Sequence, residues 1–205
     1  DLSVKHGIKN FIFGSTSSIY GLTSQVPFKE TDPVSCPISP YAVTKRAAEQ
    51  MCFTYSHNYG LPVTCLRFFT VYGPRQRPEM AIHSFSRLIS ENKPITVYGD
   101  GGSERDYTFI DDIISGLVSC LDKPMRYEII NLGNNRRIKL IDLIHLIEKI
   151  LGKKAEIRFL PEQPGDVPLT FADIQKANKI LGYLPKTPIE KGLEVFIDWF
   201  RKSIK

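Results

Sequence analysis

The chain has 205 residues, of which 42% are hydrophobic and 24% are charged, and its formal net charge is +5. This composition is ordinary for a globular protein and excludes a disordered, collagen-like or disulfide-scaffold chain. Because no stretch approaches the roughly 18 consecutive apolar residues of a membrane span, we expect no membrane partner. The sequence has no long basic run, so we also expect no nucleic-acid partner.

The cysteines and histidines show no pattern that binds a metal. None of the four cysteines forms a C-x-x-C pair, and the four histidines have no ligand spacing, so we expect no metal site. Reduced, unpaired cysteines are typical of cytoplasmic proteins, and we expect that location here.

Predicted strands and helices alternate along the chain. The first eight residues read as the end of a helix, a strand follows at 10–13, and a proline-rich loop spans 22–40. Small and apolar residues at three- and four-residue steps predict a helix over 41–58. The remaining predicted elements are strand 63–69, helix 81–90, strand 95–98, turn 99–102, extended segment 105–110, helix 111–121, strand 127–131, helix 140–151, strand 157–160, loop 161–168, helix 173–181 and helix 189–202. The alternation indicates an α/β fold with a parallel sheet.

The first candidate for chemistry is the pair Tyr41 and Lys45 in the predicted helix. Positions i and i+4 share one helix face, so the lysine ammonium lies one turn from the phenol and stabilises its phenolate. An unperturbed tyrosine has a pKa of about 10, so half-ionisation near pH 7 requires about 4 kcal/mol of stabilisation. A nearby cation acts in that direction. Taken alone, this spacing also occurs in many helices by chance.

Hydroxyl side chains follow the first predicted strand, where residues 15–21 read Ser-Thr-Ser-Ser-Ile-Tyr-Gly. The carboxyl ends of parallel strands are where α/β folds bind ligands. A hydroxyl there can bond a substrate hydroxyl and share its proton with the phenolate. A Ser/Thr-rich turn without function is the alternative. The hydroxyls, the Tyr-Lys pair and the next strand are more specific together than singly.

Five ordered motifs in the sequence resemble those of one family. They are the run at 15–21, Tyr41-x-x-x-Lys45, Arg-Phe-Phe-Thr-Val-Tyr-Gly-Pro at 67–74, Arg-Asp-Tyr-Thr-Phe-Ile-Asp-Asp at 105–112 and Gln-Pro-Gly-Asp-Val-Pro at 163–168. On these motifs the chain resembles the extended short-chain dehydrogenase/reductases, in the group of NAD-dependent nucleotide-sugar epimerases and dehydratases. The resemblance covers essentially all of the chain. It implies the C-terminal part of a Rossmann-type parallel sheet plus a smaller α/β substrate-binding domain.

The resemblance also implies roles for the residues of the first three motifs. Tyr41 corresponds to the catalytic base, and Lys45 to the residue that lowers its pKa and binds the nicotinamide ribose of NAD. Thr16 corresponds to the hydroxyl partner in catalysis and contacts the substrate. Phe68 and Thr70 belong to the stretch that lines the nicotinamide and substrate pocket.

Other positions resemble the residues that bind a UDP-sugar. Arg105 resembles the arginine that clamps the diphosphate, which suits the fork of a guanidinium. Asp166 resembles the acid that holds the ribose hydroxyls of uridine. Tyr98 resembles the aromatic residue that packs near uracil, although a strand aromatic in the core is an equal alternative.

Departures from the family pattern narrow the choice among the reactions that the family catalyses. Family dehydratases carry Asp-Glu after the threonine, and UDP-glucuronate decarboxylases carry a glutamate at the second position, whereas this chain has Ser17 and Ser18. This favours simple 4-epimerisation of a UDP-sugar through a transient 4-keto intermediate. The asparagine usual in the family after Arg-x-Phe is Thr70 here. The run Arg-Gln-Arg-Pro-Glu-Met-Ala at 75–81 looks most like UDP-glucuronate 4-epimerases, with UDP-glucose 4-epimerases next.

Arg77 offers a physical reason for that choice. A glucuronate carries a C6 carboxylate, which a guanidinium grips at two points. We hypothesise that Arg77, together with Thr16, Ser17 and Ser18, recognises this carboxylate. A surface arginine in a basic loop is the alternative.

No glycine-rich turn, which the family uses to bind the NAD pyrophosphate, precedes Thr16. We therefore expect the chain, which starts at Asp1, to be the C-terminal two-thirds of a larger homodimeric enzyme, and to bind NAD poorly and be inactive alone. Residues 1–72 and about 106–132 would form the C-terminal half of the NAD-binding domain, and 73–105 and 133–205 the nucleotide-sugar-binding domain.

A nucleotide-sugar-binding fragment without catalysis, or a decarboxylase, dehydratase or reductase, remains an alternative.

Overall fold

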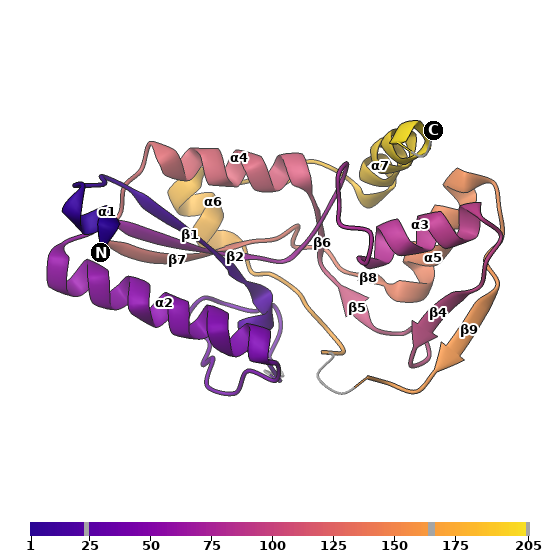
Figure 1. The fold of residues 1–205 in the computed structure, drawn as a ribbon, viewed down its shortest axis with the longest axis horizontal. Coiled ribbons are helices and arrows are strands. Elements are labelled where there is room, and N and C mark those ends of the chain that lie inside the picture. Colours follow the sequence, from indigo (N-terminus) through magenta and orange to yellow (C-terminus); the bar gives the residue numbers. More distant parts are fainter. Residues whose placement is uncertain (23–24, 164–166, 204–205) are drawn as a thin grey trace.

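A three-stranded parallel sheet forms the centre of one lobe of the molecule. A computed structural model of the chain describes residues 1–22, 25–163 and 167–203. The strands of this sheet, in order across it, are β1 (Phe11–Thr16), β2 (Val63–Phe68) and β7 (Tyr127–Leu132). The helices packed on it are α2 (Pro40–Tyr59) on one face, and α4 (Ile110–Leu121) and α6 (Gln175–Leu181) on the other (Figure 1). We call these elements the sheet lobe.

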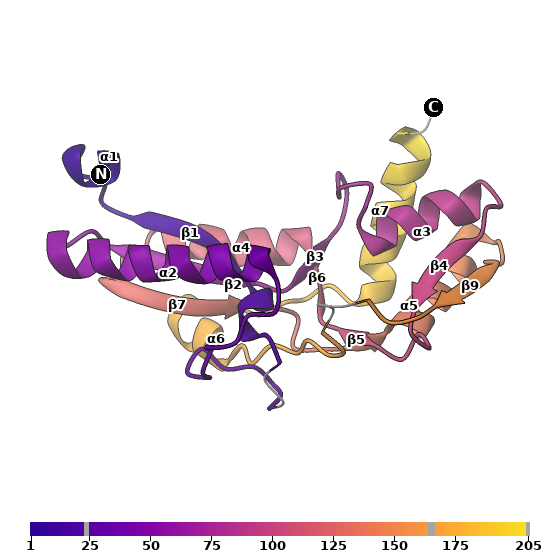
Figure 2. The same cartoon turned by 60° about the horizontal axis from the view of Figure 1, so that its bottom comes forward.

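A second lobe contains three helices and a short pair of parallel strands. Its helices are α3 (Ala81–Ser90), α5 (Leu140–Leu151) and α7 (Ile189–Ser203), and its paired strands are β4 (Ile95–Tyr98) and β9 (Ile157–Leu160). Leu143, Ile147 and Phe196, which lie on two of the helices, are all fully buried in its apolar core. The two lobes lie at opposite ends of an elongated molecule, with the N-terminus on the first and the C-terminus on the second (Figure 2).

Short elements complete the fold and link the lobes. They are α1 (Leu2–Lys5), the 3₁₀ turn η1 (Ser17–Tyr20), β3 (Thr70–Tyr72) paired in parallel with β6 (Tyr107–Phe109), and β5 (Glu104–Arg105) paired antiparallel with β8 (Ile138–Lys139).

Asp106 joins three segments between the lobes. Its side chain is fully buried between β5 and β6. One carboxylate oxygen accepts hydrogen bonds from the backbone N–H of Asn134 (2.7 Å) and the hydroxyl of Thr108 (3.2 Å). The other accepts from the backbone N–H groups of Asn135 and Ala172, each at 3.1 Å. Burial raises the pKa of this carboxyl to about 6, while the hydrogen bonds act to lower it. The carboxylate thus fixes the loop after β7 and the segment before α6 against the β5–β6 junction.

The predicted α/β fold with a parallel sheet is confirmed, and most elements match within two residues. The first strand is longer than the predicted 10–13, because Gly14 to Thr16 pair with Leu66 to Phe68 of β2. The helix predicted from residue 173 begins at Gln175, since the Asp173 carboxylate accepts from the Gln175 backbone N–H (2.8 Å). The two-residue strand β8 was not predicted, because so short a segment has no periodicity.

Replacing Asp106 with Asn should destabilise the fold. An amide places an N–H against backbone N–H donors, which leaves at least one buried donor without an acceptor. We expect the free energy of unfolding to fall by about 3 kcal/mol in urea melts at pH 7.5. The control is Asp111→Asn, the same change at an exposed position in the first turn of α4, with an expected loss below about 1 kcal/mol. Equal losses in the two variants would contradict this role for Asp106.

Candidate active site

The end of β1 presents three consecutive hydroxyl side chains. Thr16 has extended backbone geometry and caps the turn η1, because its Oγ1 accepts from the backbone N–H of Ser18 at 3.2 Å. The same hydroxyl donates to Oγ of Ser18 at 3.1 Å. Together with Ser17, these residues line a cavity of about 550 Å³. The strand end therefore supplies a fixed row of small polar groups.

The Tyr41 and Lys45 side chains lie at the start of α2. Ser39 caps this helix by accepting from the Ala42 backbone N–H (3.2 Å), and Pro40 occupies the first turn, where its missing N–H costs nothing. Tyr41 is 53% exposed and lines the same cavity. Lys45 Nζ donates to the carbonyl of Gly14 at 2.8 Å and lies 5.9 Å from the centroid of the Tyr41 ring. The spacing thus brings the pair onto one helix face beside β1.

This first cavity gathers most of the residues singled out by sequence. Its lining residues are Ser15, Thr16, Ser17, Ser18, Tyr41, Phe68, Phe69, Thr70, Val71, Arg75, Gln76, Arg77 and Met80. They come from β1, α2, the segment from Phe68 to Val71 and the loop before α3. Phe68 approaches β1 closely, since a Cβ at Gly14 would lie 3.2 Å from its ring. Glycine at that position leaves room for the aromatic ring at the strand end.

The loop 73–80 carries both arginines of this cavity. Arg75 has a φ of +66°, a left-handed conformation that few non-glycine residues adopt. The backbone between the arginines is fixed, because the Gln76 side chain donates to the carbonyl of Val71 (3.1 Å) and His83 Nδ1 donates to the carbonyl of Gln76 (2.7 Å). The Arg77 side chain is 76% exposed and pairs with Glu79 at 3.4 Å. Since such exposed pairs contribute little, its guanidinium can turn toward a ligand at small cost.

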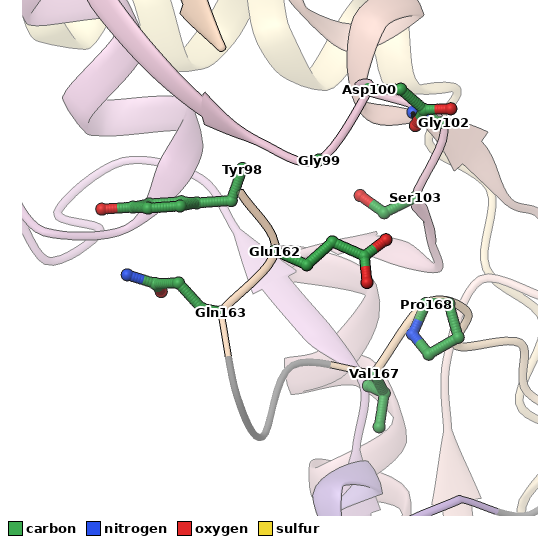
Figure 3. A pocket seen from close by; sticks show the side chains of 9 residues that line it. All are labelled: Tyr98, Gly99, Asp100, Gly102, Ser103, Glu162, Gln163, Val167 and Pro168. Carbon is green, nitrogen blue, oxygen red and sulfur yellow. Dashed lines mark hydrogen bonds between the residues drawn. The ribbon is translucent and has the colours of Figure 1, made fainter. Parts of the chain in front are cut away.

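Two further cavities flank Tyr98, on the other side of the start of α3. We call one of them the second cavity; it has a volume of about 420 Å³, and its lining residues include Arg105, Tyr98, Ser84 and Phe85. The other, the third cavity, has a volume of about 310 Å³. It is drawn in Figure 3, where the Glu162 side chain extends between Tyr98 and Pro168. Tyr98 is 40% exposed. Its ring therefore lines two cavities instead of lying in the core.

One residue of the predicted set has no description here. Asp166 lies outside the described residues, as do its neighbours 164 and 165. The two sides of this gap, Gln163 and Val167, line the cavity shown in Figure 3.

Several site residues were missed by the sequence reasoning. Gln76, Ser103 and Glu162 line the cavities, and their positions beside family motifs were the available signal. Glu49 and Arg67 lie fully buried behind the first cavity. Glu49 follows Lys45 by four residues, so its place on the Tyr41 and Lys45 face was visible in the spacing. It was overlooked because a glutamate in a helix is usually solvated.

The described residues offer neither a metal-binding cluster nor a membrane-spanning helix. Within residues 1–22, 25–163 and 167–203, no three His, Cys, Asp or Glu side chains cluster as a metal ion requires. None of the helices in those ranges combines the length and the apolar character needed to cross a membrane.

The fold and the site define a Rossmann-type α/β protein with a Tyr-Lys pair beside strand-end hydroxyls. Residues 1–133 match the model of the NAD dependent epimerase/dehydratase family. The chain belongs to this family, because the match spans more than half of its length, and the resemblance seen in the sequence is confirmed.

Relatives of known name are similar along nearly the whole chain. The UDP-glucuronate 4-epimerase of Thermodesulfobacterium geofontis is 45% identical over 206 residues, which cover 100% of this chain and 63% of the relative. The crystal structure of UDP-glucuronic acid 4-epimerase from Bacillus cereus, in complex with UDP-glucuronic acid and NAD, has a TM-score of 0.90 and 43% identity, covering 95% of this chain and 62% of that one. The UDP-glucose 4-epimerase of Thermotoga maritima with UDP-glucose has a TM-score of 0.94 and 34% identity, covering 99% and 67%. The chain thus spans somewhat less than two-thirds of the length of the curated relatives it matches first.

Proposed function

We propose that the chain carries the proton-transfer and sugar-binding residues of an NAD-dependent UDP-sugar 4-epimerase, with UDP-glucuronate favoured and UDP-glucose next. One observation carries this proposal: Tyr41, Thr16 and Arg77, from three separate segments, line a single cavity. The named relatives support it, because they are UDP-glucuronate and UDP-glucose 4-epimerases.

The residues at the first cavity fit the nicotinamide end of NAD. The Lys45 ammonium is held at the strand end by the Gly14 carbonyl, and the Tyr41 hydroxyl is exposed beside it, so both can donate to ribose hydroxyls. The space that Gly14 leaves open is filled by the Phe68 ring, which offers an apolar surface to a flat heterocycle. NAD, when bound there, would supply a reversible hydride acceptor for the sugar C4.

Tyr41 would take the proton of the sugar C4 hydroxyl when the C4–H bond breaks, and would return it when that bond forms again. Thr16 would hydrogen-bond the same hydroxyl and orient it for transfer. Ser17 and Ser18 supply hydroxyls in place of the acid and base that elimination requires, which supports epimerisation without loss of water. Thr70 would contact the sugar from the start of β3. The epimerase therefore needs only one proton carrier near C4.

The remaining polar groups would bind the rest of the substrate. Arg105 lines the second cavity, where its guanidinium would meet the diphosphate. Tyr98, between the second cavity and the third, would stack on uracil. Asp166, outside the described residues, is retained as the ribose contact. In this reading the substrate spans from the strand-end hydroxyls to the Tyr98 ring.

The proposal includes the domain boundaries, the oligomeric state and the cellular location of the protein. Residues 1–72 and about 106–132 would belong to the NAD-binding domain, and residues 73–105 and 133–205 to the nucleotide-sugar-binding domain. We propose a homodimer, and a cytoplasmic location, which is supported by four cysteines that are all unpaired.

Tyr41→Phe tests the proton-transfer role. Loss of the phenol hydroxyl should lower the epimerisation rate by about 10²–10⁴-fold, because no other group takes the C4 proton. Affinity for UDP-glucuronate should stay within threefold. Product formation with added NAD is followed by chromatography on the whole protein, whether that is this chain or a longer one that contains it. Tyr59→Phe, at the exposed far end of α2, should keep the wild-type rate. Turnover that survives in the Tyr41 variant would refute the assignment.

Arg77→Leu tests the recognition of the sugar carboxylate. Removal of a charge-assisted contact should weaken UDP-glucuronate binding about tenfold in calorimetry. UDP-glucose, which lacks the carboxylate, should bind as it does to the wild type. Arg87→Leu removes a half-exposed arginine from α3, where it pairs with Glu91, and should change neither affinity. An equal loss for both sugars in the Arg77 variant would exclude carboxylate recognition by this residue.

A further inference from the structure

The helix that carries the Tyr-Lys pair contacts β1 at two successive turns. Tyr41, Lys45 and Glu49 follow one another at four-residue steps, so they share one face of α2. Lys45 donates to the carbonyl of Gly14, and Glu49 Oε1 accepts from the hydroxyl of Ser15 at 2.7 Å. Adjacent residues of β1 therefore hold adjacent turns of α2. The next residue of β1 is Thr16, the hydroxyl partner of the proposed reaction.

Glu49 is held in place by a buried arginine. Its side chain is fully buried, and that of Arg67 on β2 is only 1% exposed. Arg67 donates from Nε to one carboxylate oxygen (3.0 Å) and from Nη2 to the other (2.9 Å). A two-point bond of this kind fixes the orientation of both groups. The position of Glu49 along and around the helix axis is thereby set relative to β2.

The same arginine reaches the turn that follows Thr16. Arg67 Nη1 donates to the hydroxyl of Tyr20 (3.0 Å), and Tyr20 donates in turn to Oδ1 of Asn131 on β7 (2.7 Å). Burial raises the pKa of Tyr20 to about 12, against the influence of Arg67, so the phenol keeps its proton and can donate. Ser15 before Thr16 and Tyr20 after it are thus both bonded to one set of buried groups. We call Ser15, Tyr20, Glu49, Arg67 and Asn131 the Glu49 network.

Apolar packing alone does not fix α2 in this position. The three fully buried residues of the helix, Ala42, Glu49 and Ser56, include no large apolar side chain. Partly buried Cys52 and Tyr55 pack against an apolar cluster, but they lie in the half of the helix away from the Tyr-Lys pair. Ser56 donates its hydroxyl to the backbone carbonyl of Arg126. Near the Tyr-Lys pair the helix is therefore seated through small and polar residues, and its placement there depends on directional hydrogen bonds.

We propose that Glu49 is a positioning residue, which acts through Ser15 and Arg67 to hold Tyr41 and Lys45 in line with Thr16. Its effect on turnover rests on the proposed function, whereas its effect on the geometry of the Tyr-Lys pair does not. A displacement of about 1 Å between reacting groups can cost on the order of a hundredfold in rate. The loss of one bond from the network should therefore appear in kcat before it appears in binding.

Ser15→Ala is the decisive variant, because it removes one hydrogen bond without leaving a buried charge unpaired. We expect kcat for UDP-glucuronate to fall about tenfold, KM to stay within twofold and the melting temperature to stay within a few degrees. Glu49→Gln, which also breaks the ion pair, should lower kcat further where it folds. The matched control is Thr64→Val on β2, because Thr64 is equally buried but its hydroxyl has no hydrogen-bond partner. It should leave kcat and KM at wild-type values.

A second measurement separates this proposal from the proposed function. In ¹H–¹³C NMR spectra of the chain, Ser15→Ala should shift the side-chain signals of Tyr41 and Lys45, whereas Thr64→Val should not. Tyr41 signals are assigned with Tyr41→Phe. Signals of Tyr41 and Lys45 that stay in place, or an unchanged kcat in an active wild type, would overturn the positioning role and leave the network a matter of stability only. The kinetic arm uses the whole protein with added NAD. Absence of turnover in that wild type would count against the proposed function, and the NMR shifts would still decide the positioning role.

Discussion

The four hydrogen bonds accepted by Asp106 hold together segments that lie between the two lobes. Their donors lie on β6, on the loop after β7 and on the segment before α6, so one buried carboxylate bonds three stretches of the chain. A buried carboxylate is costly unless its lone pairs are filled, so the surrounding backbone has little freedom to choose another arrangement. Arg105 directly precedes Asp106, and the residue that joins the segments therefore also sets the position of the arginine in the second cavity.

Some of the side chains that line the cavities are held rigidly, whereas others can change conformation. The strand-end hydroxyls and the Tyr-Lys pair are placed by a parallel sheet and a long helix, whose backbones are fixed by regular hydrogen bonds. The arginines of loop 73–80 have a fixed backbone but exposed side chains, as the His83 and Gln76 contacts show. The proposed chemistry at one sugar carbon would require placement within a fraction of an ångström, whereas a guanidinium can reach a carboxylate from several rotamers. In this chain the loop can therefore adapt to a ligand while the strand-end hydroxyls and the Tyr-Lys pair stay in place.

The sequence predicted what depends on local spacing. The helix bearing Tyr41 and Lys45 follows from the three- and four-residue periodicity, and Thr16 follows from its place after an apolar strand. Ser39 and Pro40, predicted as the end of a loop, cap and open this helix. What could not be predicted depends on pairing or on distant packing. Gly14 to Thr16 read as a loop by composition, and only pairing with β2 makes them strand. Likewise, nothing near Glu49 in the sequence shows that Arg67, eighteen residues later, neutralises it in the core.

The buried ion pair of Glu49 and Arg67 is better explained by its effect on the position of α2 than by a contribution to the stability of the fold. Replacing a buried pair with apolar residues of similar volume is often neutral or stabilising, by about 1–4 kcal/mol, so stability alone gives little reason to keep it. An apolar face on α2 would also tolerate rotation and sliding, since apolar contacts have no direction. The face in question already carries Tyr41 and Lys45, which leaves little room for large apolar side chains near the site. A charged, two-point contact one turn further on holds the helix in a single position, and the cost of burying it is offset by the bonds to Arg67 and Ser15.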